Sequence, residues 1–230
     1  MIGQTLQPPS LWEWVGDHAG LILTRVGTHA ALTAIAVAAG LVISLPISVV
    51  CYRYFRVYTP VTALAGLLYT IPSLALFILL IPITGLTYLS VEIGLVSYTL
   101  LILIRNIVVG LRQVPEDVRE AATGMGYSRR QLLWRVQLPL ALPAIVAGLR
   151  VATVSTVGLV TVGFIIGKGA LGELIIEGLN RFYTPEVIVG AVLAIALALT
   201  ADALLLGAQR VMMPWARRRE TPMLVGRKLG

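Results

Sequence analysis

Long apolar runs are the feature that most constrains this chain. Five runs, at about residues 28–50, 60–81, 93–111, 140–166 and 186–213, are almost free of charged side chains. Each approaches or exceeds the roughly 20 residues with which a helix crosses a bilayer. We therefore predict an all-α, polytopic membrane protein with about five transmembrane helices.

The composition supports this class and narrows the chemistry. Only 13% of the 230 residues are charged, whereas soluble domains carry about 25%. The single cysteine, Cys51, excludes an internal disulfide and a cysteine-based metal cluster, and two histidines are too few for a histidine-rich site. No repeat is evident, so we expect one membrane domain over residues 1–230, with no metal site and no cofactor of its own.

Arginine and lysine indicate how the chain sits in the membrane. Positive residues mark cytoplasmic loops, and they gather after the first run, in the long polar loop and in the tail: Arg53, Arg56, Arg105, Arg112, Arg119, Arg129, Arg130, Arg135, Arg217, Arg218, Arg219, Arg227 and Lys228. We expect residues 112–139 and the basic tail 214–230 in the cytoplasm and residues 1–27 outside. This distribution explains the net charge of +7 without a nucleic-acid partner.

The external segment carries two tryptophans that suit a membrane surface. Residues 11–26 are predicted to form an interfacial helix, with Trp12 and Trp14 at the level of the lipid headgroups.

The polar segment 115–139 is the exception in this apolar chain. Pro115 suits a first helical turn, and a short helix over 115–123 would end at Gly124 and Gly126. Ser128 and Gln131 fit a capping box for a second short helix that ends at Leu138-Pro139. These two helices predict a compact docking knob, although ordinary cytoplasmic loops carry the same capping signals.

The segment resembles a known motif. Its residues are similar to the EAA loop of permease subunits in binding-protein-dependent ABC importers, with valine in place of the usual isoleucine: Glu120, Ala121, Ala122, Gly126, Val136, Leu138 and Pro139. The resemblance implies the type I ABC importer permease fold. It also implies that the loop contains a coupling helix, which sits in a groove of an ATPase subunit.

Four further segments resemble osmoprotectant permeases for glycine betaine, carnitine or choline: 69–76, 105–106, 138–145 and 167–173. The resemblance implies a prokaryotic cytoplasmic membrane and several partners. These are a second permease (a copy or a paralogue), two cytoplasmic ATPase subunits that bind ATP-Mg, and an external substrate-binding protein. The chain has no GxxxxGK[ST] motif, so we expect a transport subunit that is not itself an enzyme.

Two groups of residues are candidates for the passage and its gate. Pro72 favours a bend, and Tyr69, Thr70 and Ser73 beside it could line a polar passage; a static kink and packing or lipid-facing aromatics are the alternatives. Gly163 and Gly167 form a GxxxG pattern at the end of the fourth run. They would provide either a sliding surface between two permeases or close packing within one.

Other functional classes remain open. An importer permease for methionine or another small solute would share the EAA loop, and a membrane scaffold would use the loop for docking alone. An ion-coupled secondary carrier would use Asp202, the clearest ionisable residue inside a run. Asp202 near Thr200 is better explained as a hydrogen-bonded structural contact, and Arg150 is expected to snorkel or to pair near the membrane surface.

Overall fold

The computed structural model describes residues 10–213, and every regular element in this range is helical. The elements are α1 (Leu11–Asp17), α2 (Ala19–Arg53), α3 (Phe55–Thr70), α4 (Ser73–Thr84), α5 (Tyr88–Arg112), α6 (Glu116–Gly124), α7 (Arg129–Leu132), α8 (Leu138–Val162), α9 (Leu171–Asn180) and α10 (Thr184–Met212). A π-helical turn, Leu133–Gln137, joins α7 to α8, and a 3-10 turn, Gly163–Ile166, follows α8. The basic tail 214–230 lies outside the described residues.

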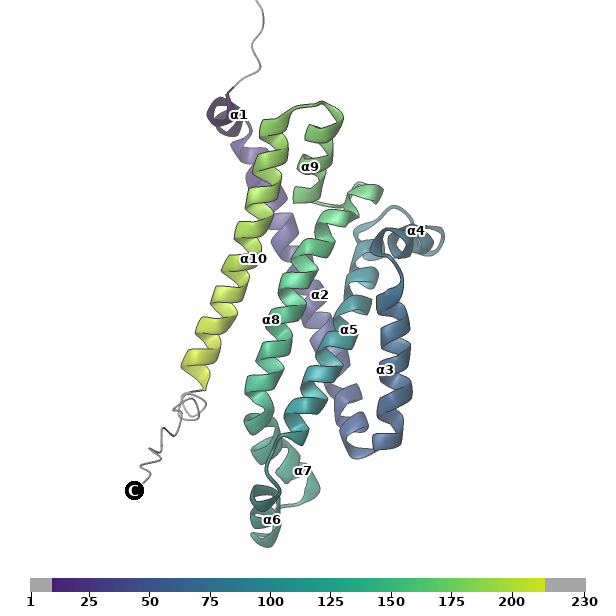
Figure 1. Ribbon diagram of the computed structural model, residues 1–230, viewed down its shortest axis with the longest axis vertical. Coiled ribbons are helices and arrows are strands. Elements are labelled where there is room, and N and C mark those ends of the chain that lie inside the picture. The colour runs from purple at the N-terminus through teal and green to yellow at the C-terminus, as the bar shows by residue number, and fades with distance from the viewer. Residues whose placement is uncertain (1–9, 214–230) are drawn as a thin grey trace, which may run out of the picture.

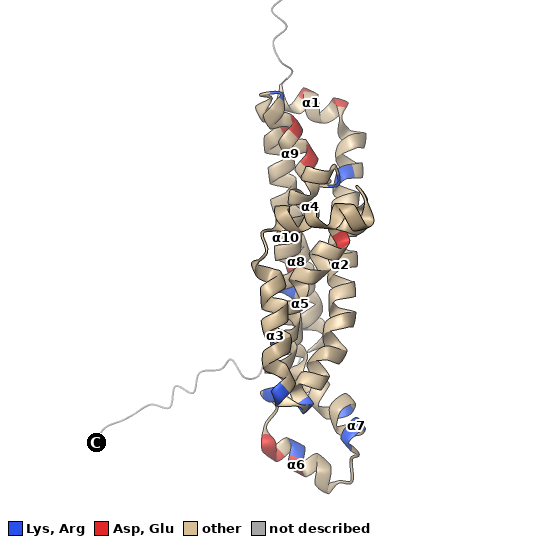
Figure 2. Cartoon of the chain, turned by 90° about the vertical axis from the view of Figure 1, so that its right-hand side faces the viewer, with Lys and Arg blue, Asp and Glu red and all other residues tan. Residues whose placement is uncertain are grey.

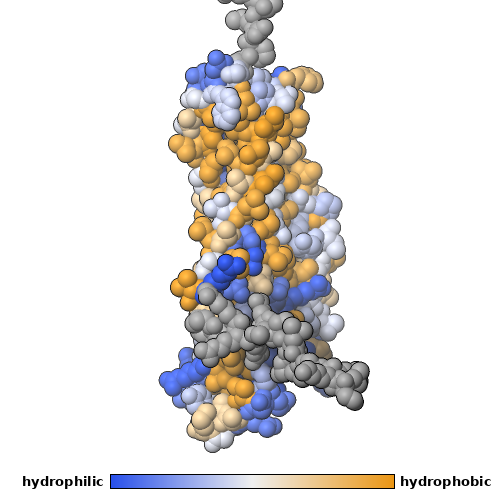
Figure 3. Space-filling view, turned by 60° about the vertical axis from the view of Figure 1, so that its left-hand side comes forward, coloured by the Kyte–Doolittle hydropathy of each residue, from blue (hydrophilic) through white to orange (hydrophobic). Residues whose placement is uncertain are grey.

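The long helices form one elongated bundle (Figure 1). Four of the described helical segments are long and apolar enough to cross a membrane, and the α3–α4 pair adds a fifth if its two bent halves count as one span. α5 packs between α2 and α8, α3 lies against α5, and α10 lies against α8 and α9. Figure 3 shows hydrophobic side chains over most of the lateral face on the α10 side, with hydrophilic groups gathered toward the ends.

Small residues permit the close helix packing at the centre of the bundle. A Cβ atom on Gly40 of α2 would lie 1.9 Å from Oγ1 of Thr99 on α5. A Cβ atom on Gly148 of α8 would lie 2.5 Å from Cβ of Asn106 on α5. His29 of α2 adds a buried hydrogen bond from Nε2 to the carbonyl oxygen of Val157 on α8, 2.9 Å away. The three central spans are therefore held by close approach and by polar contacts as well.

The second apolar run is broken rather than continuous. α3 and α4 meet at an angle of 95° across Ile71 and Pro72, so the run predicted over 60–81 is a bent pair of helices, and the bend predicted at Pro72 is confirmed. Pro72 has no N–H and forces Ile71 out of the helical conformation. The carbonyl of Ile71, which the break frees, accepts a hydrogen bond from the hydroxyl of Tyr98.

The N-terminal helix also differs from the expectation. A capping box between Ser10 and Glu13 starts α1, which ends at Asp17, and α2 begins at Ala19, so the helix predicted over 11–26 is split at His18. Trp12 is exposed, as expected for a headgroup-level residue. Trp14 is buried instead, stacked on His18 with ring centroids 4.6 Å apart.

The two glycines of the GxxxG pattern do not share a helical face. The chain tightens into a 3-10 turn at Gly163 and enters the left-handed region at Gly167, with φ of 66°. The carbonyl of Gly163 accepts a hydrogen bond of 3.0 Å from the backbone N–H of Lys168, and a Cβ atom on Gly163 would lie 2.9 Å from the Lys168 carbonyl oxygen. Gly163 therefore packs closely against its own chain, and its role at an interface between two permeases stays a prediction.

Asp202 is part of an ion pair between two spans. Nε and Nη2 of Arg150 donate to the two carboxylate oxygens of Asp202, both over 2.7 Å, and so tie α8 to α10. Thr200 instead donates to the carbonyl of Ala196 in its own helix. The structural-contact hypothesis for Asp202 is confirmed, with Arg150 rather than Thr200 as its partner. Arg150 lies midway along α8, farther from the helix ends than expected.

This pair predicts a specific mutational pattern. Asp202→Ala leaves a guanidinium without its counter-charge between two apolar helices, so we expect the melting temperature of the purified chain to fall by several degrees. Arg150→Met combined with Asp202→Leu removes both charges and should recover most of that loss. Differential scanning fluorimetry in detergent measures both.

Thr200→Ala is the control, and we expect it to leave the melting temperature nearly unchanged. A double variant as unstable as Asp202→Ala alone would contradict a purely structural role for the pair.

Candidate functional site

The polar segment 115–139 forms a compact knob at one end of the bundle, the end at which α10 also finishes (Figure 1). α6 begins after Pro115, and Glu116 and Asp117 occupy its first turn, where negative charge suits the positive end of a helix. The chain reverses at Gly126, whose φ of 85° favours glycine. The first predicted helix and its glycine turn are therefore present.

The second helix begins as expected but does not stop. The Gln131 backbone N–H donates to Oγ of Ser128 over 3.3 Å, and the Ser128 N–H donates to Oε1 of Gln131 over 2.8 Å, which completes the capping box. The helix then continues through the π-helical turn Leu133–Gln137 into α8. The prediction that Leu138-Pro139 ends the helix was wrong, because Pro139 falls in the first turn of α8, where its missing N–H is tolerated.

The EAA-like residues divide into an exposed group and a buried group. Glu120, Ala121 and Gly126 are exposed on the outer side of the knob. Within residues 10–213, Glu120 makes no hydrogen bond or ion pair, so no internal contact occupies its carboxylate. The motif's remaining members face inward to different degrees: Ala122 and Leu138 are buried, and Val136 and Pro139 are partly buried.

Two large apolar side chains on the knob were not found from the sequence. Met125 is 71% exposed at the end of α6, and Trp134 is 56% exposed in the π-helical turn. Buried interface cores are enriched in methionine and aromatic residues. The occurrence of Met125 and Trp134 in a polar segment was the sequence signal that could have identified them. The knob therefore exposes large apolar side chains as well as polar ones.

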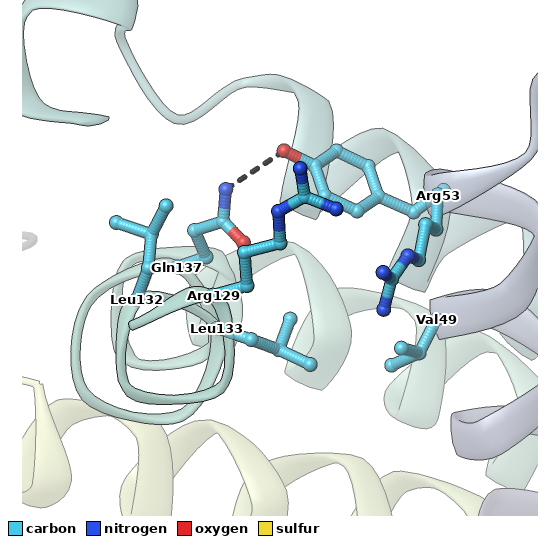
Figure 4. A pocket seen from close by; sticks show the side chains of 7 residues that line it. Val49, Arg53, Arg129, Leu132, Leu133 and Gln137 are labelled. Carbon is cyan, nitrogen blue, oxygen red and sulfur yellow. Dashed lines mark hydrogen bonds between the residues drawn. The ribbon is translucent and has the colours of Figure 1, made fainter. Parts of the chain in front are cut away.

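Tyr52 anchors the knob to the bundle, and sequence reasoning missed it too. Its hydroxyl oxygen accepts a hydrogen bond of 2.8 Å from Nε2 of the buried Gln137 (Figure 4). It also accepts one of 3.3 Å from Nη1 of Arg119. Arg119 also pairs with Glu116 over 2.8 Å. The bond to Tyr52 is the main cause of the raised pKa of Arg119, so this guanidinium stays charged. One hydroxyl on α2 thus connects α6 with the start of α8.

The candidate passage residues gather at the elbow between α3 and α4. Tyr69 is exposed, and its ring meets that of Tyr98 edge to face at 5.6 Å. The hydroxyl of Thr70 donates to the carbonyl of Leu67, while Pro72 and Ser73 begin α4. The 3-10 turn that starts at Gly163 contacts α4. The structure therefore places one gate candidate on an element that touches α4, the helix that follows the elbow, and the roles of both groups stay predictions.

The comparisons with known proteins decide the family. Residues 36–218 match the family described as "Binding-protein-dependent transport system inner membrane component". The osmoprotectant import permease protein OsmW of Salmonella typhimurium is 36% identical over 203 residues, which are 86% of this chain and 94% of that protein. This chain belongs to that permease family.

Two further likenesses agree with this assignment. The permease is 31% identical over 207 residues to the choline transport system permease protein OpuBB of Bacillus subtilis, covering 90% of this chain and 95% of that protein. Its fold matches a chain of the inward-facing MetNI methionine ABC transporter with a TM-score of 0.70, covering 83% of this chain and 97% of that one. At 21% identity the latter likeness concerns the fold alone. The predicted all-α importer-permease fold is confirmed.

Removal of one hydroxyl tests the anchor. Tyr52→Phe keeps the ring and leaves the amide of Gln137 buried without its partner, at a cost of about 1–3 kcal/mol. We expect faster hydrogen–deuterium exchange over residues 115–128, because α6 loses its tie to α2.

Tyr58→Phe is the matched control, since the Tyr58 ring packs beside the same end of the bundle and no hydrogen bond of its hydroxyl is found among residues 10–213. Equal exchange in the two variants would show that Tyr52 does not hold the knob.

Proposed function

We propose that this permease carries an osmoprotectant of the glycine betaine, choline or carnitine type across the cytoplasmic membrane, driven by ATP hydrolysis in a separate subunit. The observation that carries the proposal is the EAA-like knob, with Glu120, Ala121 and Gly126 exposed on its outer side. The solute class rests on relatives at 31–36% identity that are named osmoprotectant and choline permeases.

The knob is the element through which ATP hydrolysis acts. The exposed side of α6 docks in a groove of the ATPase, and each of two ATPase subunits binds ATP-Mg and engages one permease of a pair. Tyr52 joins Arg119 on α6 to Gln137 at the start of α8 and to its own helix α2. A displacement of α6 is therefore passed to two spans that pack against the central helix α5.

The two ends of the bundle suit two different partners. Arginines gather around the knob and the adjoining helix ends, whereas acidic side chains are frequent on α1 and α9 at the far end (Figure 2). By the preference of positive charge for the cytoplasmic side, the knob faces the cytoplasm and the ATPases. The α1–α9 end then faces the exterior, where a separate binding protein delivers the solute.

The alternatives are less well supported. The methionine transporter shares the fold at 21% identity, which carries no information on the solute. An ion-coupled carrier would need Asp202 as an exchangeable site, and both of its carboxylate oxygens are engaged by Arg150. A scaffold role does not explain why the chain contains the bent α3–α4 pair.

Reconstituted transport tests the proposal. Proteoliposomes that contain the permease, its ATPase and its binding protein should accumulate labelled glycine betaine, choline or carnitine only when ATP is supplied. Gly126→Ala places a side chain at φ of 85°, which costs about 1–2 kcal/mol and distorts the knob. We expect several-fold less uptake per ATP hydrolysed, and Glu120→Lys should weaken ATPase binding.

Gly124→Ala is the matched control, because Gly124 is helical and a Cβ atom there would meet nothing within 4 Å. Uptake driven by an ion gradient without ATP would overturn the importer assignment. Equal coupling in the Gly126→Ala and Gly124→Ala proteins would overturn the role of the knob.

A further inference from the structure

A basic pocket lies beside the Tyr52 anchor. It has a volume of about 280 Å³ and is lined by the inner end of α2 and by the α7–α8 connection. Arg53 approaches it from α2 and Arg129 approaches it from α7, so that the two side chains point toward one another (Figure 4). The rest of the lining combines the hydroxyl of Tyr52 and the amide of Gln137 with three apolar side chains: Val49, Leu132 and Leu133.

The charge in this pocket is not balanced by the protein. No carboxylate lines it, and within residues 10–213 neither Arg53 nor Arg129 forms an ion pair. The Arg53 guanidinium contacts the ring of Tyr54, at 5.7 Å from the centroid. Arg119 also bonds to Tyr52, but its charge is paired with Glu116. Like charges that face one another repel, and an anion between them removes that repulsion.

The level of the pocket along the bundle indicates where such an anion comes from. Arg53 is the last residue of α2, and the next two residues, Tyr54 and Phe55, are both more than half exposed. The Arg112 guanidinium at the end of α5 lies 4.1 Å from the centroid of the Phe55 ring. Exposed aromatic rings among arginines at helix ends are typical of the membrane–water interface. Lipid headgroups therefore reach the pocket, and its apolar residues can meet the start of an acyl chain.

We propose that this pocket binds the phosphate group of an anionic phospholipid, with Arg53 and Arg129 on either side of it. Basic pockets between helices at a membrane surface hold such headgroups, and guanidinium groups suit phosphate because of their planar set of donors. The bound lipid bridges α2 and α7. It therefore fixes the knob from a second side, next to the Tyr52 hydrogen bonds, and makes the position of the knob sensitive to membrane composition.

Native mass spectrometry of the full-length permease in detergent tests this site, with phosphatidylglycerol and phosphatidylcholine of equal chain length as probes. We expect the first phosphatidylglycerol to bind more tightly than phosphatidylcholine. Replacing both pocket arginines, Arg53→Gln with Arg129→Gln, should lower the affinity for phosphatidylglycerol by about 30-fold, the factor that two arginine–lipid attractions provide. Arg53→Lys with Arg129→Lys keeps the positive charge and should retain much of the preference for phosphatidylglycerol over phosphatidylcholine. This result would confirm that the pocket is intact in a doubly substituted protein.

The charge-matched control is Arg130→Gln with Arg135→Gln, two exposed arginines of the same loop that do not line the pocket. We expect this pair to bind phosphatidylglycerol nearly as the unaltered permease does. Equal weakening in both glutamine pairs would show general surface attraction and overturn the proposal. Displacement of the lipid by inorganic phosphate at millimolar concentration would assign the pocket to a soluble anion and overturn the lipid assignment.

Discussion

A backbone inside a bilayer must satisfy its own hydrogen bonds, and this constraint explains most of the fold. Helices meet it without help, so the spans are long and packed by close approach at Gly40 and Gly148. Where the chain departs from a helix, a specific partner replaces the lost bond. Tyr98 serves the freed carbonyl of Ile71 at the α3–α4 elbow, and the Lys168 N–H serves Gly163 after α8. The Arg150–Asp202 pair balances two charges between spans in a similar way.

The knob is the polar exception in this apolar bundle. Its helices are short, α7 starts with a capping box, the chain turns at Gly126, and Glu120, Met125 and Trp134 are exposed. A small element of this kind transmits force only if it is tied to the bundle. The continuous helix from α7 into α8 provides one connection, and the Tyr52 hydroxyl provides another. Under the proposed function, coupling therefore depends on a few polar contacts at the end of an otherwise apolar bundle.

Much of this arrangement was predictable from the sequence. Hydropathy gave the membrane class and the spans, and the proline, glycine and serine signals gave α6, the Gly126 turn and the capping box. Other features were missed or wrong, and three of them show the physical reasons. Tyr52 lies 67 and 85 residues from its partners, so no local pattern reveals it. Sequence rules for proline end a helix at Pro139, but the π-helical turn keeps this helix continuous there. The GxxxG spacing gave no sign that a 3-10 turn would separate Gly163 from Gly167.

The central claim is that the outer side of the knob contacts the ATPase, and site-specific photocrosslinking measures this contact directly. A benzophenone amino acid is placed at Ala121 on α6 or, as the comparison, at Phe182, which is exposed between α9 and α10 at the far end of the bundle. In the assembled transporter, position 121 should form a covalent adduct with the ATPase subunit and position 182 should form none. An ATPase adduct from position 182, or none from position 121, would contradict the account.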